Sequence, residues 1–315
     1  MLKYILQKLL LALVVLLGVT ILDFALMSMA GSPIDMMSGP RISQEALAIR
    51  AAEWGLDQPV WKQYLGWLGE VLQGNLGYSY KSYQPVTEIV GQKLGPTLLL
   101  MGAGLAAGLL IAIPAGIYSA VHRYRKRDYA VVTTSFVLSS VPGFFLALVL
   151  VYLFHVTLGW LPSSGMTTPN TGGDVLDVLR HMVMPVMVLA AGVAGSNIRY
   201  VRSAMLEILE MDYIRTAKAK GLGQMLVIGR HAWRNALLSV VTVIGMQLPT
   251  LVGGAVIVEQ VFRWPGLGME TFSAITDRDY PVVMGVCLLS AVVVLAANLL
   301  TDILCALVDP RIRYD

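Results

Sequence analysis

Charged side chains are scarce in this chain. Asp, Glu, Lys and Arg make up 14% of its 315 residues, whereas apolar residues make up 56%, and the mean hydropathy is +0.68. A soluble domain usually carries about 25% charged residues. The composition therefore excludes an ordinary soluble protein and predicts an integral membrane protein. The formal net charge of +3 is too small to indicate a nucleic-acid partner, and we expect none.

The residue types that build disulfides, metal sites and nucleotide sites are also few. Cys287 and Cys305 lie 18 positions apart in one apolar run, about 27 Å along a helix, so they cannot form a disulfide with each other. The four histidines are scattered, and there is no His-Glu-x-x-His motif. No Gly-x-x-x-x-Gly-Lys-Ser/Thr sequence occurs, so the phosphate cradle of a P-loop ATPase is missing. We expect no metal, no cofactor and no catalytic residue on this chain.

Six apolar segments are long enough to cross a bilayer, for which about 20 helical residues are needed. In the first, the apolar run from Leu9 to Met27 exceeds the roughly 7–15 residues of a signal peptide. A retained helix is therefore favoured, although Ser28-Met29-Ala30 resembles a signal-peptidase site and leaves cleavage as the alternative. The predicted spans fall within residues 1–30, 97–120, 129–154, 181–198, 236–262 and 282–307.

Small and polar residues interrupt these apolar runs. Gly104 and Gly108 form a small-xxx-small pair that permits close helix contact, and Pro142-Gly143 lies at mid-depth in the third span. Polar residues inside membrane spans usually face the protein interior or a water-filled path. Residues that could line a polar route or bond between helices are Asp23, Gln247, Asn298 and Asp302.

Residues 31–96 form a mixed segment that does not span the membrane. Ser43 is placed to cap a helix that ends at Trp54, before Gly55, and Asp57-Gln58-Pro59 starts a second helix. Trp and Tyr residues crowd this segment, as they do at the level of the lipid headgroups. We expect the segment to close the outer face or to contact a partner.

Lys and Arg are unevenly distributed between the connecting segments. When the termini, residues 121–128 and residues 199–235 are placed on one side, that side holds 15 of the 23 Lys and Arg residues in the shorter stretch of chain. Cytoplasmic loops of membrane proteins are enriched in Lys and Arg. The bias therefore predicts that both termini and the 199–237 segment lie in the cytosol.

The segment 199–237 is a polar island between two apolar segments. It holds seven of the Lys and Arg residues and is broken at Gly221 and Gly223. The pattern predicts a short amphipathic helix outside the bilayer, a turn, and a helix that leads back into the membrane. The apolar stripe of the first helix includes Val201, Met205, Ile208 and Leu209, at helical spacing.

Within this island, DYIRTAKAKGL and HAWRNAL resemble the cytoplasmic signature loop of ABC importer permeases, in the variant of the dipeptide, oligopeptide and nickel branch. The generic loop carries Glu-Ala-Ala, three residues and Gly, and here only Ala217 and Gly221 match it. Further phrases similar to this branch follow one another along the chain, namely GLDQP, QYLGWLGEVLQGNLGYS, HMVMPVMVLA, EQVFRWPGLG, RDYPVV and DPRIR. The chain is therefore identified as a member of this permease branch.

The resemblance implies an all-α membrane protein with six transmembrane helices and the type I ABC importer fold. Residues 1–96 would be the first helix plus an external segment, residues 97–307 the permease core, and residues 308–315 a cytoplasmic tail. The chain would form half of the pore of an ATP-driven importer in the bacterial inner membrane. Its cargo would be di- or oligopeptides or, alternatively, nickel or a metal chelate.

The resemblance also implies partners. They are a second, different permease subunit, two ATPase subunits that bind ATP and Mg, and an extracytoplasmic substrate-binding protein, besides membrane lipid. In the family the signature loop is a coupling helix that docks on an ATPase. This role would fall to Asp212, Tyr213, Ile214, Arg215, Thr216, Ala217, Lys218, Ala219, Lys220 and Gly221.

Two other classes of protein fit the hydropathy. A stand-alone secondary carrier would use Asp23, Glu259 or Asp302 as a proton site. Secondary carriers often contain inverted repeats, and we find none in this sequence. A membrane anchor without transport would not need so many spans that contain Pro and Gly. The cargo stays open between dipeptides, longer peptides, glutathione-like conjugates and nickel chelates.

Overall fold

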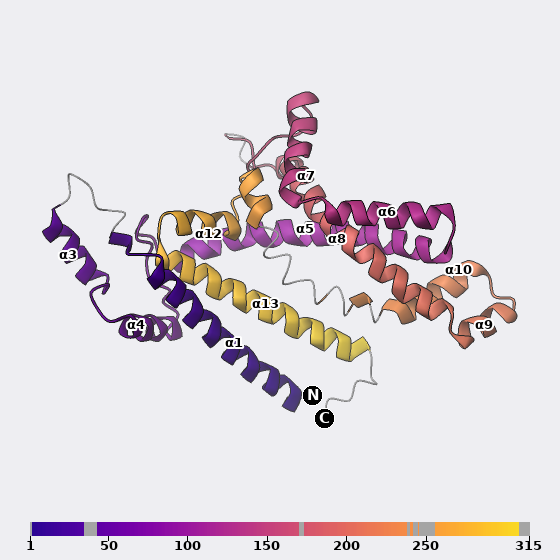
Figure 1. The fold of residues 1–315 in the computed structure, drawn as a ribbon, viewed down its shortest axis with the longest axis horizontal. Coiled ribbons are helices and arrows are strands. Elements are labelled where there is room, and N and C mark those ends of the chain that lie inside the picture. Colours follow the sequence, from indigo (N-terminus) through magenta and orange to yellow (C-terminus); the bar gives the residue numbers. More distant parts are fainter. Residues whose placement is uncertain are drawn as a thin grey trace. The chain divides into compact units, whose positions relative to one another are not determined.

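The computed structural model describes residues 2–34, 43–169, 173–237, 240–241, 245 and 256–308, which form helices and connecting turns (Figure 1). Within these ranges the predicted all-α fold class is confirmed. The helices are α1 Leu2–Met29, α3 Gln44–Glu53, α4 Val60–Leu72, α5 Val86–Val121, α6 Lys126–Ser140, α7 Gly143–Leu150, the π-helical η1 Val151–Thr157, α8 Val175–Leu209, α9 Asp212–Ala219, α10 Gln224–Leu226, the π-helical η2 Val227–Trp233, α12 Leu267–Thr276 and α13 Tyr280–Val308.

The chain forms two compact units. One combines Met1–Pro96 with Gly266–Leu295, and the other combines Thr97–Pro265 with Ala296–Asp315. In the first unit, the start of α5 packs on the start of α13 through Val86 and Val282, both buried. The N-terminal segment and the last helix, far apart in sequence, therefore share one hydrophobic core.

Four helices are long and apolar enough to cross a membrane, and they correspond to the first, second, fourth and sixth predicted spans. The third differs from a single span, because α6 and the following helix α7–η1 are bent by 96° between Ser140 and Gly143. Pro142 restricts Val141 to an extended conformation, which ends α6. Most of the predicted fifth span, 236–262, lies outside the described residues.

Helix α8 is longer than the predicted fourth span, 181–198. It runs without a break to Leu209, through residues that were expected to form a separate amphipathic helix. That prediction was wrong about where the separate helix begins. Val201 and Met205 are both 0% exposed and continue the buried face of the span, so α8 continues with them. The separate helix, α9, begins only at Asp212.

The helix boundaries predicted in the external segment are confirmed. The Ser43 hydroxyl accepts a hydrogen bond from the amide of Ala46 at 3.2 Å and caps α3. Trp54 is the C-terminal cap of α3, and Gly55 follows with φ of +67°. Helix α4 begins directly after Pro59. Capping chemistry is local, which is why the sequence specified these boundaries without help from the rest of the fold.

Glycines set the distance between α5 and α8. Three residues on each helix oppose one another in the α5–α8 glycine seam: Gly104 faces Leu189, Gly108 faces Val193, and Gly116 faces Val201. A Cβ added at each glycine would lie 2.5 or 2.6 Å from the Cβ of the residue it faces, which is too close for any side chain. The predicted close contact at Gly104 and Gly108 is confirmed, and Gly116 adds a third close contact opposite Val201.

Candidate functional site

The segment that the sequence assigned to coupling contains the short helix α9. Two of its side chains face the core of their own chain, Ile214 with 0% and Ala217 with 7% of its surface exposed. They belong to one hydrophobic cluster with Met205 of α8 and Val227 of η2. Ala217 therefore packs within the chain and does not lie on the exposed face of α9.

The opposite face of α9 and the turn after it are exposed. This face carries side chains of both charge signs and one large aromatic ring. Its residues are Asp212, Tyr213, Arg215, Thr216, Lys218, Ala219 and Lys220. An ion pair of 3.5 Å joins Arg215 Nη1 to Asp212 Oδ1, but the two side chains are 74% and 96% exposed. An ion pair so exposed contributes little to stability. The side chains of this face are therefore held by few contacts within the described chain.

Gly221 ends α9 as the sequence predicted. Its φ is +78°, in the left-handed region that favours glycine, and its amide donates to the carbonyl of Lys218 at 3.0 Å. A Cβ added at Gly221 would meet nothing within 4 Å. The backbone conformation, not a lack of space, therefore requires glycine here. The chain then returns through α10 and η2.

A buried carboxylate joins the three helices α5, α6 and α8. Asp128, in the first turn of α6, is 2% exposed. Its Oδ1 and Oδ2 accept hydrogen bonds from Nε and Nη2 of Arg202 on α8, at 2.7 and 2.8 Å. The hydroxyl of Ser119 on α5 donates to Oδ1, and the amide of Tyr124 donates to Oδ2 at 2.9 Å. We call these four residues the charged clamp.

The connection between α5 and α6 also reaches the base of α9. Arg123 in this connection forms an ion pair with Glu210, the residue that follows the last residue of α8. The two side chains are 39% and 62% exposed, so the pair stabilises the fold only modestly. Combined with the clamp, it ties the α5–α6 connection to α8 on the side of α9. The end of α8 is therefore held both to α6 and to the connection between α5 and α6.

Two carboxylates inside the spans, Asp23 and Glu259, contact neighbouring helices. Asp23 of α1 is half-buried and lies beside the thiol of Cys287 on α13. Glu259, 0% exposed, accepts a hydrogen bond from the hydroxyl of Thr97 on α5 at 2.7 Å. These contacts support packing between helices. Of the remaining polar candidates, Asn298 and Asp302 are half-buried on α13, and Gln247 lies outside the described residues.

Reasoning from the sequence missed the charged clamp. Arg202 was counted only as one of the basic residues of the island, and Asp128 was not singled out. The pairing of residues 74 positions apart leaves no local pattern. The available signal was a lone acidic residue directly after a run of basic ones, at the start of a helix. Across the described ranges, no three His, Cys, Asp or Glu side chains are grouped so that they could hold a metal ion.

Comparison with known proteins covers nearly the whole chain. Residues 112–314 match the family described as binding-protein-dependent transport system inner membrane component, and residues 1–101 match the N-terminal region of such components. The chain is 43% identical over 316 residues to the oligopeptide transport system permease protein AppB of Bacillus subtilis, covering 100% of both chains. It is 40% identical over 337 residues to the dipeptide transport system permease protein DppB of Escherichia coli K12, covering 100% of this chain and 99% of the relative.

The fold is also similar to a solved transporter. The methionine ABC transporter MetNI, in an inward-facing conformation, gives a TM-score of 0.57 at 20% identity, covering 71% of this chain and 97% of that chain. At this identity the likeness concerns the fold alone, and it supports the type I ABC importer fold that the resemblance implied. The full-length relatives and the family match agree with the motifs around α9. The chain belongs to the family of binding-protein-dependent transport system inner membrane components.

Proposed function

We propose that this chain forms half of the translocation pore of an ATP-driven importer of di- or oligopeptides. The observation that carries the proposal is the full-length similarity, at 43% and 40% identity, to an oligopeptide permease and a dipeptide permease from two bacteria. A second, different permease subunit would form the other half. An extracytoplasmic binding protein would deliver the peptide.

In this proposal, ATP and Mg bind to two separate ATPase subunits. Two observations support the placement of ATP binding on separate subunits. The sequence has no phosphate loop, and α9 has an exposed face while its other face is packed against its own chain. Ile214 and Ala217 pack α9 against α8 and η2. A force that an ATPase subunit applies to α9 therefore moves α9 together with these two helices. The charged clamp then passes this motion to α5 and α6, which opens or closes the pore without covalent chemistry on this chain.

The proposed orientation places α9 in the cytosol and α4 outside. Lys62 on α4 and Lys218 on α9 are both exposed, so cysteines at these positions should leave the fold intact. In a chain with Cys287 and Cys305 replaced by alanine, a membrane-impermeant maleimide should label position 62 in intact cells and position 218 only after lysis. Labelling of position 218 in intact cells would overturn the orientation.

Two alanines on α9 separate docking from folding. Ala219 is exposed, so Ala219→Trp should leave protein level and melting temperature unchanged, while ATPase subunits no longer co-purify and uptake falls about tenfold or more. Ala217 is buried, so Ala217→Trp should overpack the core at a cost of about 1–3 kcal/mol or more and lower the protein level. Protein level, melting temperature, ATPase retention and uptake are measured for both. Normal uptake by Ala219→Trp at equal expression would contradict docking through this face.

Uptake in a strain that lacks this gene tests the cargo. Complementation with the wild-type chain should restore uptake of a labelled dipeptide or pentapeptide about tenfold over the empty vector, and Ala219→Trp should not. Return of nickel uptake alone would favour the nickel or metal-chelate importer. Peptide uptake that survives depletion of ATP, but stops when the proton gradient is dissipated, would favour a secondary carrier.

A further inference from the structure

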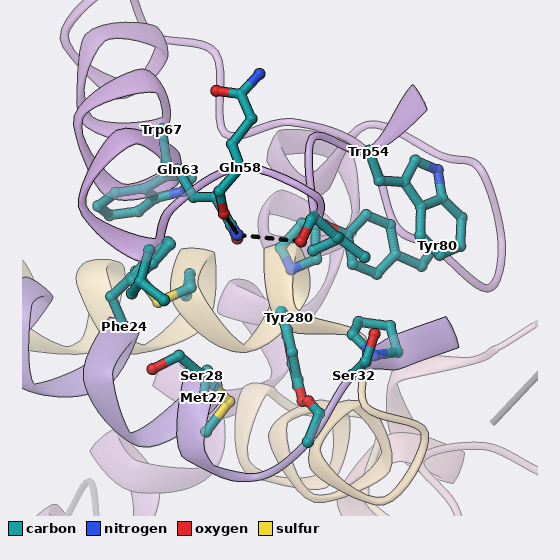
Figure 2. A pocket seen from close by; sticks show the side chains of 16 residues that line it. Phe24, Met27, Ser28, Ser32, Trp54, Gln58, Gln63, Trp67, Tyr80 and Tyr280 are labelled. Atoms are coloured by element: carbon teal, nitrogen blue, oxygen red, sulfur yellow. Dashed lines mark hydrogen bonds between the residues drawn. The ribbon is translucent and has the colours of Figure 1, made fainter. Parts of the chain in front are cut away.

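A cavity of about 490 Å³ lies in the first unit, between the end of α1, the start of α13 and the external segment (Figure 2). Its volume is within the range of about 300–1,000 Å³ that small-molecule sites have. Both α1 and α13 are candidate membrane spans, and the cavity lies at their ends, so we expect it near the boundary of the bilayer. Aromatic rings form much of its wall, including Phe24, Trp54 and Trp67, and none of the 16 residues that line it is charged.

One buried polar group beside this wall lacks a partner in the described part of the chain. The indole Nε1 of Trp67 is buried and has no hydrogen-bond partner among the described residues. A buried donor without an acceptor is rare and costs free energy. A ligand that fills the cavity and carries an acceptor oxygen would satisfy the Trp67 N–H.

A second hollow of about 340 Å³ adjoins the first and shares Trp54 and Tyr80 with it, but it is charged. Lys81 forms an ion pair with Asp277 at 2.6 Å, and this contact raises the pKa of Lys81, so its ammonium keeps its charge. Arg278 also lines the hollow, and its Nη1 donates to the carbonyl of Ser32 at 3.4 Å. Both signs of charge are therefore present beside an uncharged aromatic cavity.

We propose that the two hollows together bind one membrane phospholipid with a zwitterionic headgroup of the phosphatidylethanolamine type. The lipid phosphate complements Lys81 and Arg278, its ammonium complements Asp277, and an ester oxygen accepts the Trp67 N–H. One of its two acyl chains fills the aromatic cavity. Trp and Tyr residues gather at the level of the headgroups in membrane proteins, where phospholipid is the amphiphile present in bulk. The bound lipid would join α1, the external segment and α13 into one unit.

Native mass spectrometry of the importer complex, extracted in mild detergent from cells, tests this proposal. The wild-type complex should retain phosphatidylethanolamine. Trp67→Phe removes the donor but keeps a ring, and it should lower the retained lipid about threefold or more. Trp61→Phe is the matched control, because Trp61 is on the same helix, 61% exposed and not part of the cavity wall. Ser28→Trp, which fills the cavity from α1, should remove the lipid by a different route.

A second arm tests the headgroup. After delipidation, addition of phosphatidylethanolamine should raise the melting temperature of the wild-type complex more than addition of phosphatidylglycerol, and the difference should vanish in Ser28→Trp. Equal retention of lipid by wild type, Trp67→Phe and Ser28→Trp would overturn the site. Equal stabilisation by the two lipids would overturn the headgroup assignment. A peptide or a side chain of a binding protein captured in the cavity instead would overturn the identity of the ligand.

Discussion

Replacing Asp128 by alanine is expected to destabilise the folded chain by about 3 kcal/mol. The Asp128 carboxylate is 2% exposed and pairs with Arg202 through two hydrogen bonds. Removing one partner of a buried pair costs about 3–5 kcal/mol, because the other charge stays without compensation. The Arg202 side chain is 23% exposed, so water can solvate the unpaired guanidinium in part. We therefore expect a cost at the lower end of this range. The apparent melting temperature should fall on the order of 6 °C or more.

The controls for this prediction lie in the same region. Arg127 is exposed in the first turn of α6, and Arg127→Ala should change stability by about 0.5 kcal/mol or less. Replacing both Asp128 and Arg202 by leucine removes the two charges together and should recover more than half of the lost stability. If the Asp128→Ala complex had the same melting temperature as the wild type, the charged clamp would contribute nothing to the stability of the fold.

The same double variant separates stability from coupling. We expect its helices to stay packed, although the polar link from α8 to α6 is gone. We expect its protein level and its retention of ATPase subunits to be near normal, while uptake stays well below the wild type. Uptake equal to that of the wild type would show that the clamp only holds the fold and does not pass on the motion of α9.

Adding one methyl group at Gly108 is expected to weaken the contact of α5 with α8. A Cβ there would lie 2.5 Å from Val193 Cβ and 3.1 Å from the carbonyl oxygen of Ala190, so the helices must separate. Overpacking of this kind costs about 1–3 kcal/mol, and in a membrane close packing is a main source of helix association. Gly108→Ala should therefore lower the melting temperature of the complex, the yield of folded chain and the rate of uptake.

Gly102 on the same helix provides the matched control. Nothing lies within 4 Å of a Cβ added at Gly102, and alanine favours a helix over glycine by about 1 kcal/mol. Gly102→Ala should therefore be neutral or stabilising, opposite in sign to Gly108→Ala. Replacing Val193 by glycine in the Gly108→Ala chain removes the clash and should restore part of the stability. If the Gly108→Ala and Gly102→Ala complexes both had a higher melting temperature than the wild type, the glycine seam would not limit the packing of α5 on α8.

Features that depend on short stretches of chain were predictable from the sequence. Apolar runs marked the first, second, fourth and sixth spans, since bilayer thickness alone sets their length. The caps at Ser43 and Pro59 and the positive φ at Gly221 also follow from local chemistry, because the residue itself fixes the backbone or supplies the hydrogen bond. The signature around α9 indicated the permease family, and the full-length relatives confirmed it.

Only the tertiary structure decided which residues meet across the chain. It continued α8 to Leu209 because Val201 and Met205 find a buried partner surface, which hydropathy does not register. It turned Ala217 inward and left Ala219 outside, although both are small residues on one short helix. It also brought Asp128 to Arg202. A buried charge needs a partner, but its position in the sequence does not name that partner, because distant segments become neighbours only when helices pack.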